Sequence, residues 1–275
     1  MGKVDTTYYD AALRQRAVLL NSTPRYENGA ISHRESVAEL WSDFTYMALP
    51  FLALSAFYAR DEKLFQEIVR QCDLQKQVLQ DNATGLWKHI VGPDSPDPGL
   101  WSSGNGWAAC GLVRVFALVL KFDSLEAGKL PRQLESVLET TIVSIIGAAA
   151  SSKSHEDGLL PNYLDDASYF GENAGTAAIA SAVFRMASLK PSAISAKYIA
   201  WAVKSLEAVL SHTSEDGTVS PVANPMDAHD RAPFPQSAEG QAFTLHLIAA
   251  HRDWTKSEST RTSILDAKPE RRTCF

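Results

Sequence analysis

The sequence predicts an all-α protein, an α/α toroid built from helical hairpins. Apolar residues recur at helical spacing along most of the 275-residue chain. One pattern also occurs four times: a helix, a turn, an extended segment with a polar loop, and a helix rich in Gly and Ala. The turn glycines lie about 55 to 75 residues apart, which suits a helical hairpin with a long loop. Small residues let helices pack closely, so the Gly/Ala-rich helices should form an inner ring and the amphipathic ones an outer ring.

The first unit begins with an expected helix over residues 6–20 and a loop over 21–33 that contains a turn at Gly29. The small apolar helix that follows contains Asp43. Pro50 should kink or restart this helix, because proline lacks the amide hydrogen that a helix interior uses.

The other three units repeat this order. Asp61 should cap the next helix, and turns are expected at Gly85, Gly158 and Gly217. The remaining expected elements are helices ending near 79 and over 108–120, 130–150, 173–187, 193–210 and 237–254, and extended segments over 86–91, 159–164 and 218–222. From residue 255 the chain is polar and charged, so we expect one domain over 1–254 and a disordered tail over 255–275.

Composition narrows the possible partners. A net charge of −6 argues against nucleic acid, and without a run of eighteen apolar residues no membrane span is expected. Cys72, Cys110 and Cys274 are far apart and predict neither a disulfide framework nor a zinc site. The first residues contain no apolar signal core, so the sequence predicts a cytoplasmic protein with free thiols and no cofactor.

Asp43 is the candidate catalytic residue. It lies between Trp41 and Phe44 in a mostly apolar stretch over residues 39–53. A carboxylate in such surroundings loses hydration, which favours the protonated form that a proton donor needs at neutral pH. The alternative is a structural acid that is hydrogen-bonded to a nearby loop.

A pocket is expected where the loops and inner-helix starts meet at one end of the ring. Aromatic rings beside amide, imidazole and carboxylate groups suit a carbohydrate, because the rings cover its C–H surface and the polar groups bind its hydroxyls. Alternatively, Trp101 and Trp107 simply fill the barrel. Asp227 and His229 lack a third partner at metal-ligand spacing, so a polar loop is the preferred interpretation there. The candidates are His33, Arg34, Trp41, Asp43, His89, Trp101, Asn105, Trp107, Tyr163, Asp165, Asp166, Tyr169, Glu172, Asn173, Asn224, His229, Ser237 and Glu239.

Three motifs carry a family resemblance that covers about residues 20 to 254. Ile31-Ser-His-Arg34, together with Leu40-Trp-Ser-Asp-Phe-Thr-Tyr-Met47 and Pro50-Phe-Leu52, resembles the catalytic hairpin of six-hairpin glycosidases. The closest branch is the unsaturated rhamnogalacturonyl hydrolases of glycoside hydrolase family 105, which are related to family 88. Leu100-Trp-Ser-Ser-Gly-Asn-Gly-Trp107 is similar to that family's Leu-Trp-x-Arg-Gly-Asn-Gly-Trp. Ser237-Ala-Glu-Gly-Gln-Ala-Phe243 resembles the last inner helix of fungal members.

The resemblance implies an (α/α)6 barrel that hydrates the C4=C5 double bond of the unsaturated uronic acid left by pectin lyases. Asp43 would be the general acid and base, and the partner would be an oligosaccharide, with neither metal nor cofactor. The residues implied in substrate binding are His33, Arg34, Trp41, Trp101, Asn105 and Trp107.

Two departures leave alternatives open. Ser103 occupies the place of the family's Arg, which removes a cation that would suit an acidic substrate. The sequence also shows about four hairpins, whereas the family ring has six. One of the hairpins not found here carries a second active-site Asp in the family. The chain could therefore be a truncated product, a non-catalytic or repurposed scaffold that binds a carbohydrate or small metabolite, or a shortened member that closes as a homo-oligomer.

Overall fold

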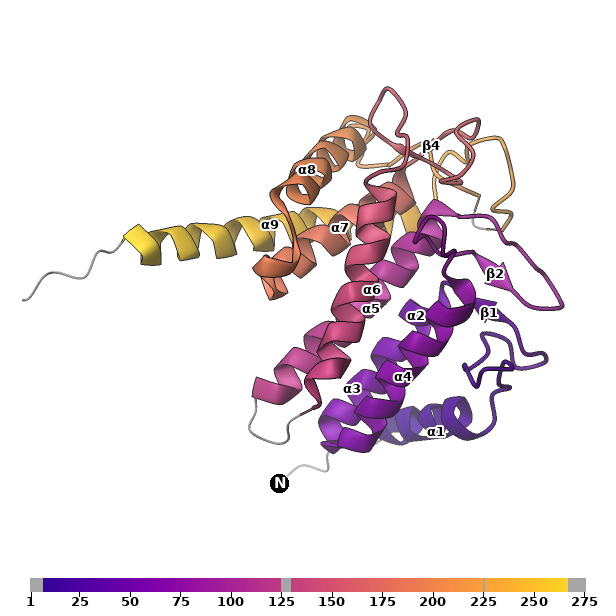
Figure 1. Ribbon diagram of the computed structural model, residues 1–275. Coiled ribbons are helices and arrows are strands. Elements are labelled where there is room, and N and C mark those ends of the chain that lie inside the picture. Colours follow the sequence, from indigo (N-terminus) through magenta and orange to yellow (C-terminus); the bar gives the residue numbers. More distant parts are fainter. Residues whose placement is uncertain (1–6, 125–129, 225, 267–275) are drawn as a thin grey trace, which may run out of the picture.

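The structure, a computed structural model, describes residues 7–124, 130–224 and 226–266 (Figure 1). Helices dominate this part of the chain, and the short strands form two antiparallel pairs, β1 with β2 and β3 with β4. The helices are α1 (Thr7–Asn21), α2 (Phe44–Met47), α3 (Leu49–Ala59), α4 (Glu62–Leu79), α5 (Ser102–Ser124), α6 (Arg132–Ala149), α7 (Asn173–Leu189), α8 (Ala196–Ser211) and α9 (Ala238–Asp266), with a 3-10 turn, η1, at Pro191–Ala193. The strands are β1 (Leu40–Trp41), β2 (Ile90–Val91), β3 (Leu160–Pro161) and β4 (Gly171–Glu172).

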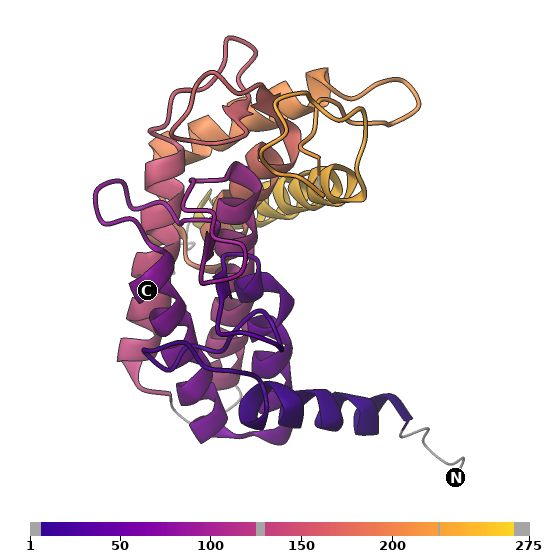
Figure 2. The ribbon, with the colours of Figure 1, turned by 90° about the vertical axis from the view of Figure 1, so that its right-hand side faces the viewer.

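The described helices form an arc of four hairpins. Each hairpin pairs one outer helix with the next inner one: α1 with α2 and α3, α4 with α5, α6 with α7, and α8 with α9. The inner helices pack in chain order, α3 on α5, α5 on α7 and α7 on α9. The long loops within the hairpins all lie at the same end of the helices, on one side of the molecule (Figures 1 and 2). The series of helices begins with α1 and ends with α9, which lie at opposite extremes of the arc. This arrangement confirms the predicted α/α-toroid class and the hairpin repeat.

Small residues bring the inner helices close together, as the sequence predicted. A Cβ atom added to Gly111 would lie 2.3 Å from the carbonyl oxygen of Thr45, and one on Gly175 would lie 2.4 Å from Ser102 Oγ. The outer helices instead bury one face of larger side chains, such as Phe65 and Ile68 on α4. Crowding is therefore greatest on the inside of the arc.

The predicted turns are confirmed at all four glycines. Gly29, Gly85, Gly158 and Gly217 have φ between +85° and +91°, a backbone conformation that glycine adopts without steric cost. Pro50 occupies the first turn of α3 and restarts the helix after α2, as expected. Asp61 caps α4, because its side chain accepts a hydrogen bond from the amide of Leu64 at 3.0 Å.

Several boundaries differ from the prediction. The extended segments expected over 86–91 and 159–164 shorten to two residues each, because strand pairing is confined to the loop crossings. The helix expected over 108–120 begins at Ser102, since its glycines lie inside the crowded inner ring, where a larger residue would not fit. The disordered tail expected from residue 255 is wrong as far as Asp266, which ends α9, because neither Gly nor Pro interrupts that stretch. Residues 267–275 lie outside the described residues.

Helix α5 is long and apolar enough, by length and composition, to cross a membrane. However, 67% of its most apolar window is buried inside the protein. A buried core helix passes the same test, and α5 lies between α3, α6 and α7.

The helices at the N-terminal end of the arc leave large apolar side chains exposed. On α1, Tyr8 is 84% exposed and no residue of that helix is buried. Tyr58 on α3 is 76% exposed, and Leu54 lies beside it in a groove of about 540 Å³ between α1 and α3. Exposed apolar faces of this kind are what an incomplete ring would leave at its ends, because its end helices lack neighbours.

Candidate active site

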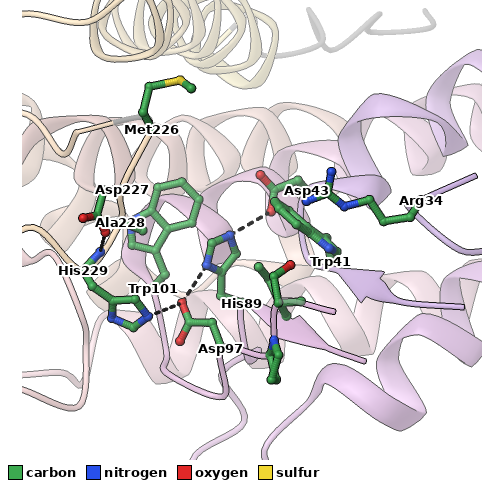
Figure 3. Close-up of a pocket in the computed structure, with 13 residues that line it drawn as sticks. Arg34, Trp41, Asp43, His89, Asp97, Trp101, Met226, Asp227, Ala228 and His229 are labelled. Carbon is green, nitrogen blue, oxygen red and sulfur yellow. Dashed lines mark hydrogen bonds and ion pairs between the residues drawn. The ribbon is translucent and has the colours of Figure 1, made fainter. Parts of the chain in front are cut away.

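A cavity of about 410 Å³ opens at the loop end of the arc, where three of the four hairpins contribute side chains (Figure 3). Its acidic, basic and aromatic residues come from the segments before α2, around β2 and before α9. The lining residues are Arg34, Trp41, Asp43, His89, Ile90, Ser95, Pro96, Asp97, Trp101, Met226, Asp227, Ala228 and His229.

Asp43 immediately precedes α2, but its carboxylate does not cap that helix. Instead Oδ2 lies 3.7 Å from Nε2 of His89 and accepts a hydrogen bond from the Ser42 hydroxyl at 3.1 Å. The pairing of β1 with β2 produces this meeting, because the Ser42 amide donates to the His89 carbonyl at 2.9 Å. The Asp43 side chain keeps 13% of its surface exposed, so it can contact both His89 and a bound molecule.

Asp97 orients His89. The Asp97 carboxylate is buried and lies 2.8 Å from Nδ1 of His89, and it accepts a hydrogen bond from the Tyr163 hydroxyl at 2.6 Å. Burial alone would raise the pKa of Asp97, but the hydrogen bonds from His89 and Tyr163 outweigh burial and lower it. Asp97 is therefore ionised at neutral pH, which favours the His89 tautomer with hydrogen on Nδ1 and directs Nε2 toward Asp43.

Two tryptophans flank His89. The Trp101 ring centroid lies 4.5 Å from that of His89, and the Trp41 ring meets His89 edge to face at 5.5 Å. The guanidinium of Arg34 stacks over Trp41, 4.6 Å from the ring centroid. The cavity therefore combines aromatic surface, one guanidinium and a carboxylate–imidazole pair.

Glu39 holds this wall in place. It is buried, and it accepts hydrogen bonds from the Trp41 indole at 2.8 Å and from the Ser95 amide at 2.8 Å. Burial opposes ionisation of Glu39, but these donors and the Asp94 amide lower its pKa. Trp41 is thereby fixed to the loop that carries Asp97.

Seven residues were expected from the resemblance to act on the substrate: Asp43 as the catalytic acid and six others in sugar binding. The structure brings four of these seven together in the cavity and places the other three behind its walls. Arg34, Trp41, Asp43 and Trp101 line the cavity. The remaining three, His33, Asn105 and Trp107, do not line it, and their direct contact with a sugar stays a prediction that the cavity geometry does not support.

The contacts of these three residues are those of supports. His33 stacks on Trp41 with ring centroids 4.7 Å apart, and burial lowers its pKa. Asn105 is fully buried, and its side chain bonds the Trp87 amide at 2.8 Å and the Trp101 carbonyl at 2.9 Å. Trp107 packs against aromatic side chains of α2 and α9, as the barrel-filling alternative expected.

Ser103, in the place of the family's Arg, faces a buried carboxylate. Its hydroxyl donates to Glu172 Oε2 at 3.2 Å, and Glu172 also accepts from the amides of Ala174 and Gly175. Burial raises the pKa of Glu172 in spite of these donors. Ser103 does not line the cavity, so Arg34 is the arginine that does.

Asp97 and Glu39 were not among the residues expected in the pocket, whereas His229 was, and it lies beside Asp97. His229 Nε2 lies 3.4 Å from Asp97 Oδ2, and its ring stacks on Tyr163 with centroids 5.1 Å apart. Asp97 looks like an ordinary loop residue in sequence, and only its eight-residue spacing from His89 could have drawn attention to it.

Comparison with known proteins shows which family this chain resembles. The family model described as Glycosyl Hydrolase Family 88 matches residues 2–231. The unsaturated rhamnogalacturonyl hydrolase YesR of Bacillus subtilis (strain 168) is 28% identical over 232 residues, which cover 80% of this chain and 61% of the relative. The chain thus spans about three fifths of the length of this curated relative.

Solved structures show the same fold. A possible member of family GH105 from Salmonella enterica serovar Paratyphi A superposes with a TM-score of 0.78 at 22% identity, covering 91% of this chain and 67% of that one. A family 88 glycosyl hydrolase from Bacteroides vulgatus gives a TM-score of 0.68 at 16% identity, covering 92% and 70%. Covering about two thirds of such a chain is what four hairpins of a six-hairpin ring would do.

Proposed function

Because the chain belongs to glycosyl hydrolase family 88, we propose that it hydrolyses unsaturated uronyl oligosaccharides by hydrating the C4=C5 double bond of the terminal sugar. The observation that carries this proposal is the Asp43–His89–Asp97 chain between two tryptophans in an open cavity. It supplies one carboxyl group for proton transfer and aromatic surface for a sugar ring.

In the proposed mechanism the protonated Asp43 carboxyl donates its proton to C4. Positive charge develops at C5 and is shared with the ring oxygen. A water molecule attacks C5 and gives its proton to the Asp43 carboxylate, which restores the acid. The hemiketal formed at C5 then opens, and the glycosidic bond breaks to release the remaining saccharide.

His89 positions the acid in this scheme. With hydrogen on Nδ1, its Nε2 is an acceptor that faces the carboxyl group, 3.7 Å from Asp43 Oδ2. Closing that gap on substrate binding would let Nε2 accept a hydrogen bond from the Asp43 hydroxyl, which fixes the orientation of the acid before its proton passes to C4. Asp97 keeps the imidazole in the tautomer that this role needs.

Arg34 is the proposed partner of the substrate carboxylate. It stacks on Trp41 at the edge of the cavity, and its side chain is 42% exposed, so a uronate could approach it from the open side. Glu39 Oε2 lies 3.7 Å away and leaves part of the guanidinium fork for a ligand. This cation would compensate for the neutral Ser103.

The test follows the absorbance of the 4,5-double bond during incubation with lyase-digested rhamnogalacturonan. Wild-type protein should remove the absorbance, and Asp43→Asn should abolish turnover because an amide cannot transfer the proton. Asp94→Asn, on the exposed loop beside the cavity, is the matched control and should retain the rate. Absence of turnover by wild type would overturn the proposal, and calorimetric sugar binding without turnover would identify a non-catalytic binder.

We also propose that the protein self-associates through the groove between α1 and α3, which exposes Tyr8, Leu54 and Tyr58. Monomeric proteins rarely leave contiguous apolar patches of this kind in water. Light scattering at several concentrations measures the mass, and a constant monomer mass would contradict this proposal.

A further inference from the structure

A second cavity, of about 580 Å³, is lined by residues of the inner helices α2, α5, α7 and α9. It shares no lining residue with the candidate active site. Three inner helices each contribute one basic side chain to it: Arg114 from α5, Arg185 from α7 and His246 from α9.

The two arginines occupy equivalent positions. Arg114 and Arg185 each lie twelve residues after the first residue of their helix, from 102 to 114 and from 173 to 185. These helices begin at the same level, because a Cβ on Gly175 would meet Ser102 Oγ at 2.4 Å. At 1.5 Å rise per residue, equal offsets put both guanidinium groups at about the same depth.

The cavity carries excess positive charge. Among the residues that the structure describes, Arg114 has no carboxylate within ion-pair distance, and its guanidinium lies 4.8 Å from the Tyr46 ring centroid. Arg185 pairs with Asp253 at 2.7 Å, but Asp253 also pairs with Arg252 at 2.9 Å. The pKa of His246 is lowered by burial and by the charges of Arg114 and Arg185. The imidazole is therefore neutral at neutral pH, and the two arginines supply the positive charge.

The walls suit a compact ligand with hydrogen-bonding oxygens. Ser181 and Ser188 line the cavity beside the arginines, and Val113, Ala117 and Leu189 supply apolar surface. A guanidinium presents several N–H donors in a plane, which matches a carboxylate or phosphate better than it matches chloride.

We propose that this cavity is a binding site for a small oxyanion, a phosphate or a compact polycarboxylate, held between Arg114 and Arg185. The ligand would replace the carboxylate that Arg114 lacks. The site is separate from that of the proposed hydrolysis, because the two cavities share no lining residue.

Calorimetry with inorganic phosphate and with citrate, at constant ionic strength, tests the proposal and distinguishes the two ligand classes. At least one of these probes should bind, and Arg114→Gln should weaken binding about tenfold or more, the usual loss with one charge-assisted hydrogen bond. Arg132→Gln, an exposed arginine at the start of α6, is the matched control and should bind as wild type does. Binding of neither probe at 10 mM, or equal binding by both variants, would overturn the proposal.

A second readout comes from His246. An anion between the arginines would offset the positive charge that lowers its pKa. An NMR titration of the imidazole should therefore show a higher pKa in saturating probe than in chloride at the same ionic strength. An unchanged pKa of His246 would mean that the bound ion lies elsewhere and would also overturn the proposal.

Discussion

Glu239, in the first turn of α9, should make the stability of this protein fall as pH rises. One carboxyl oxygen, Oε1, is buried without a hydrogen-bond partner. Burial raises the pKa of Glu239 to about 8 from 4.5, and the charges of Glu172 and Asp43 add to the effect. Replacing Glu239 by Gln keeps the shape of the side chain and removes the ionisation.

The magnitude and the sign follow from linkage. Each pKa unit corresponds to about 1.4 kcal/mol, so a difference of about 3.5 units amounts to about 5 kcal/mol between the two ends of the window. Between pH 4.5 and 8 the folded state retains the Glu239 proton and the unfolded state releases it. The free energy of unfolding therefore falls across this window and levels off above the folded-state pKa.

Urea unfolding followed by tryptophan fluorescence at pH 5, 6, 7, 8 and 9 measures the effect. The free energy of unfolding of wild type should decline relative to Glu239→Gln, by about 3 kcal/mol at pH 7. Glu215→Gln, at an exposed turn, is the control and should run parallel to wild type. Parallel curves for wild type and Glu239→Gln would refute the reasoning, because they would mean that Glu239 ionises normally in the folded protein.

Three further predictions rest on single contacts. Asp97→Asn should lower kcat roughly a hundredfold in the double-bond absorbance assay, with a small change in KM, because an amide can donate as well as accept and no longer fixes the hydrogen on Nδ1 of His89; an unchanged kcat would remove Asp97 from the mechanism. Gly175→Ala should lower the free energy of unfolding by about 1 to 3 kcal/mol in urea, because the new Cβ would meet Ser102 Oγ at 2.4 Å; equal stability would show that α5 and α7 can separate freely. Tyr58→Arg should yield a smaller particle in light scattering without loss of helix by circular dichroism, since this side chain is 76% exposed; an unchanged mass would exclude the α1–α3 groove as the interface.

The hairpin repeat was predictable from sequence because its signals are local. A positive φ at Gly85 or Gly158 depends on a few residues of turn chemistry, and the caps and the break at Pro50 depend on one residue each. The strand lengths were overestimated, since pairing depends on where two loops cross, and a single segment contains no information about its partner.

The active site was predictable only in part. Asp43 and Trp41 adjoin an inner helix and do reach the cavity. Asp97 was missed because its partner Tyr163 is 66 residues away in another hairpin. Asn105 sits in a motif at the right end of the barrel, but its amide faces the backbone of its own hairpin. Position along a helix places a residue at one end of the toroid, whereas packing decides which way its side chain points.

The glycines between the inner helices have a geometric consequence for how such a protein could close. The hairpins that contain Gly111 and Gly175 are thin on the inner side, where these glycines lie, and thick on the outer side, where the side chains are larger, so each is wedge-shaped. The difference between the two thicknesses fixes the angle that each wedge adds. Bulkier residues on the inner side would make the arc less curved, so that more hairpins would be needed to close the ring. The size of the residues on the inner side therefore determines how many hairpins complete the ring.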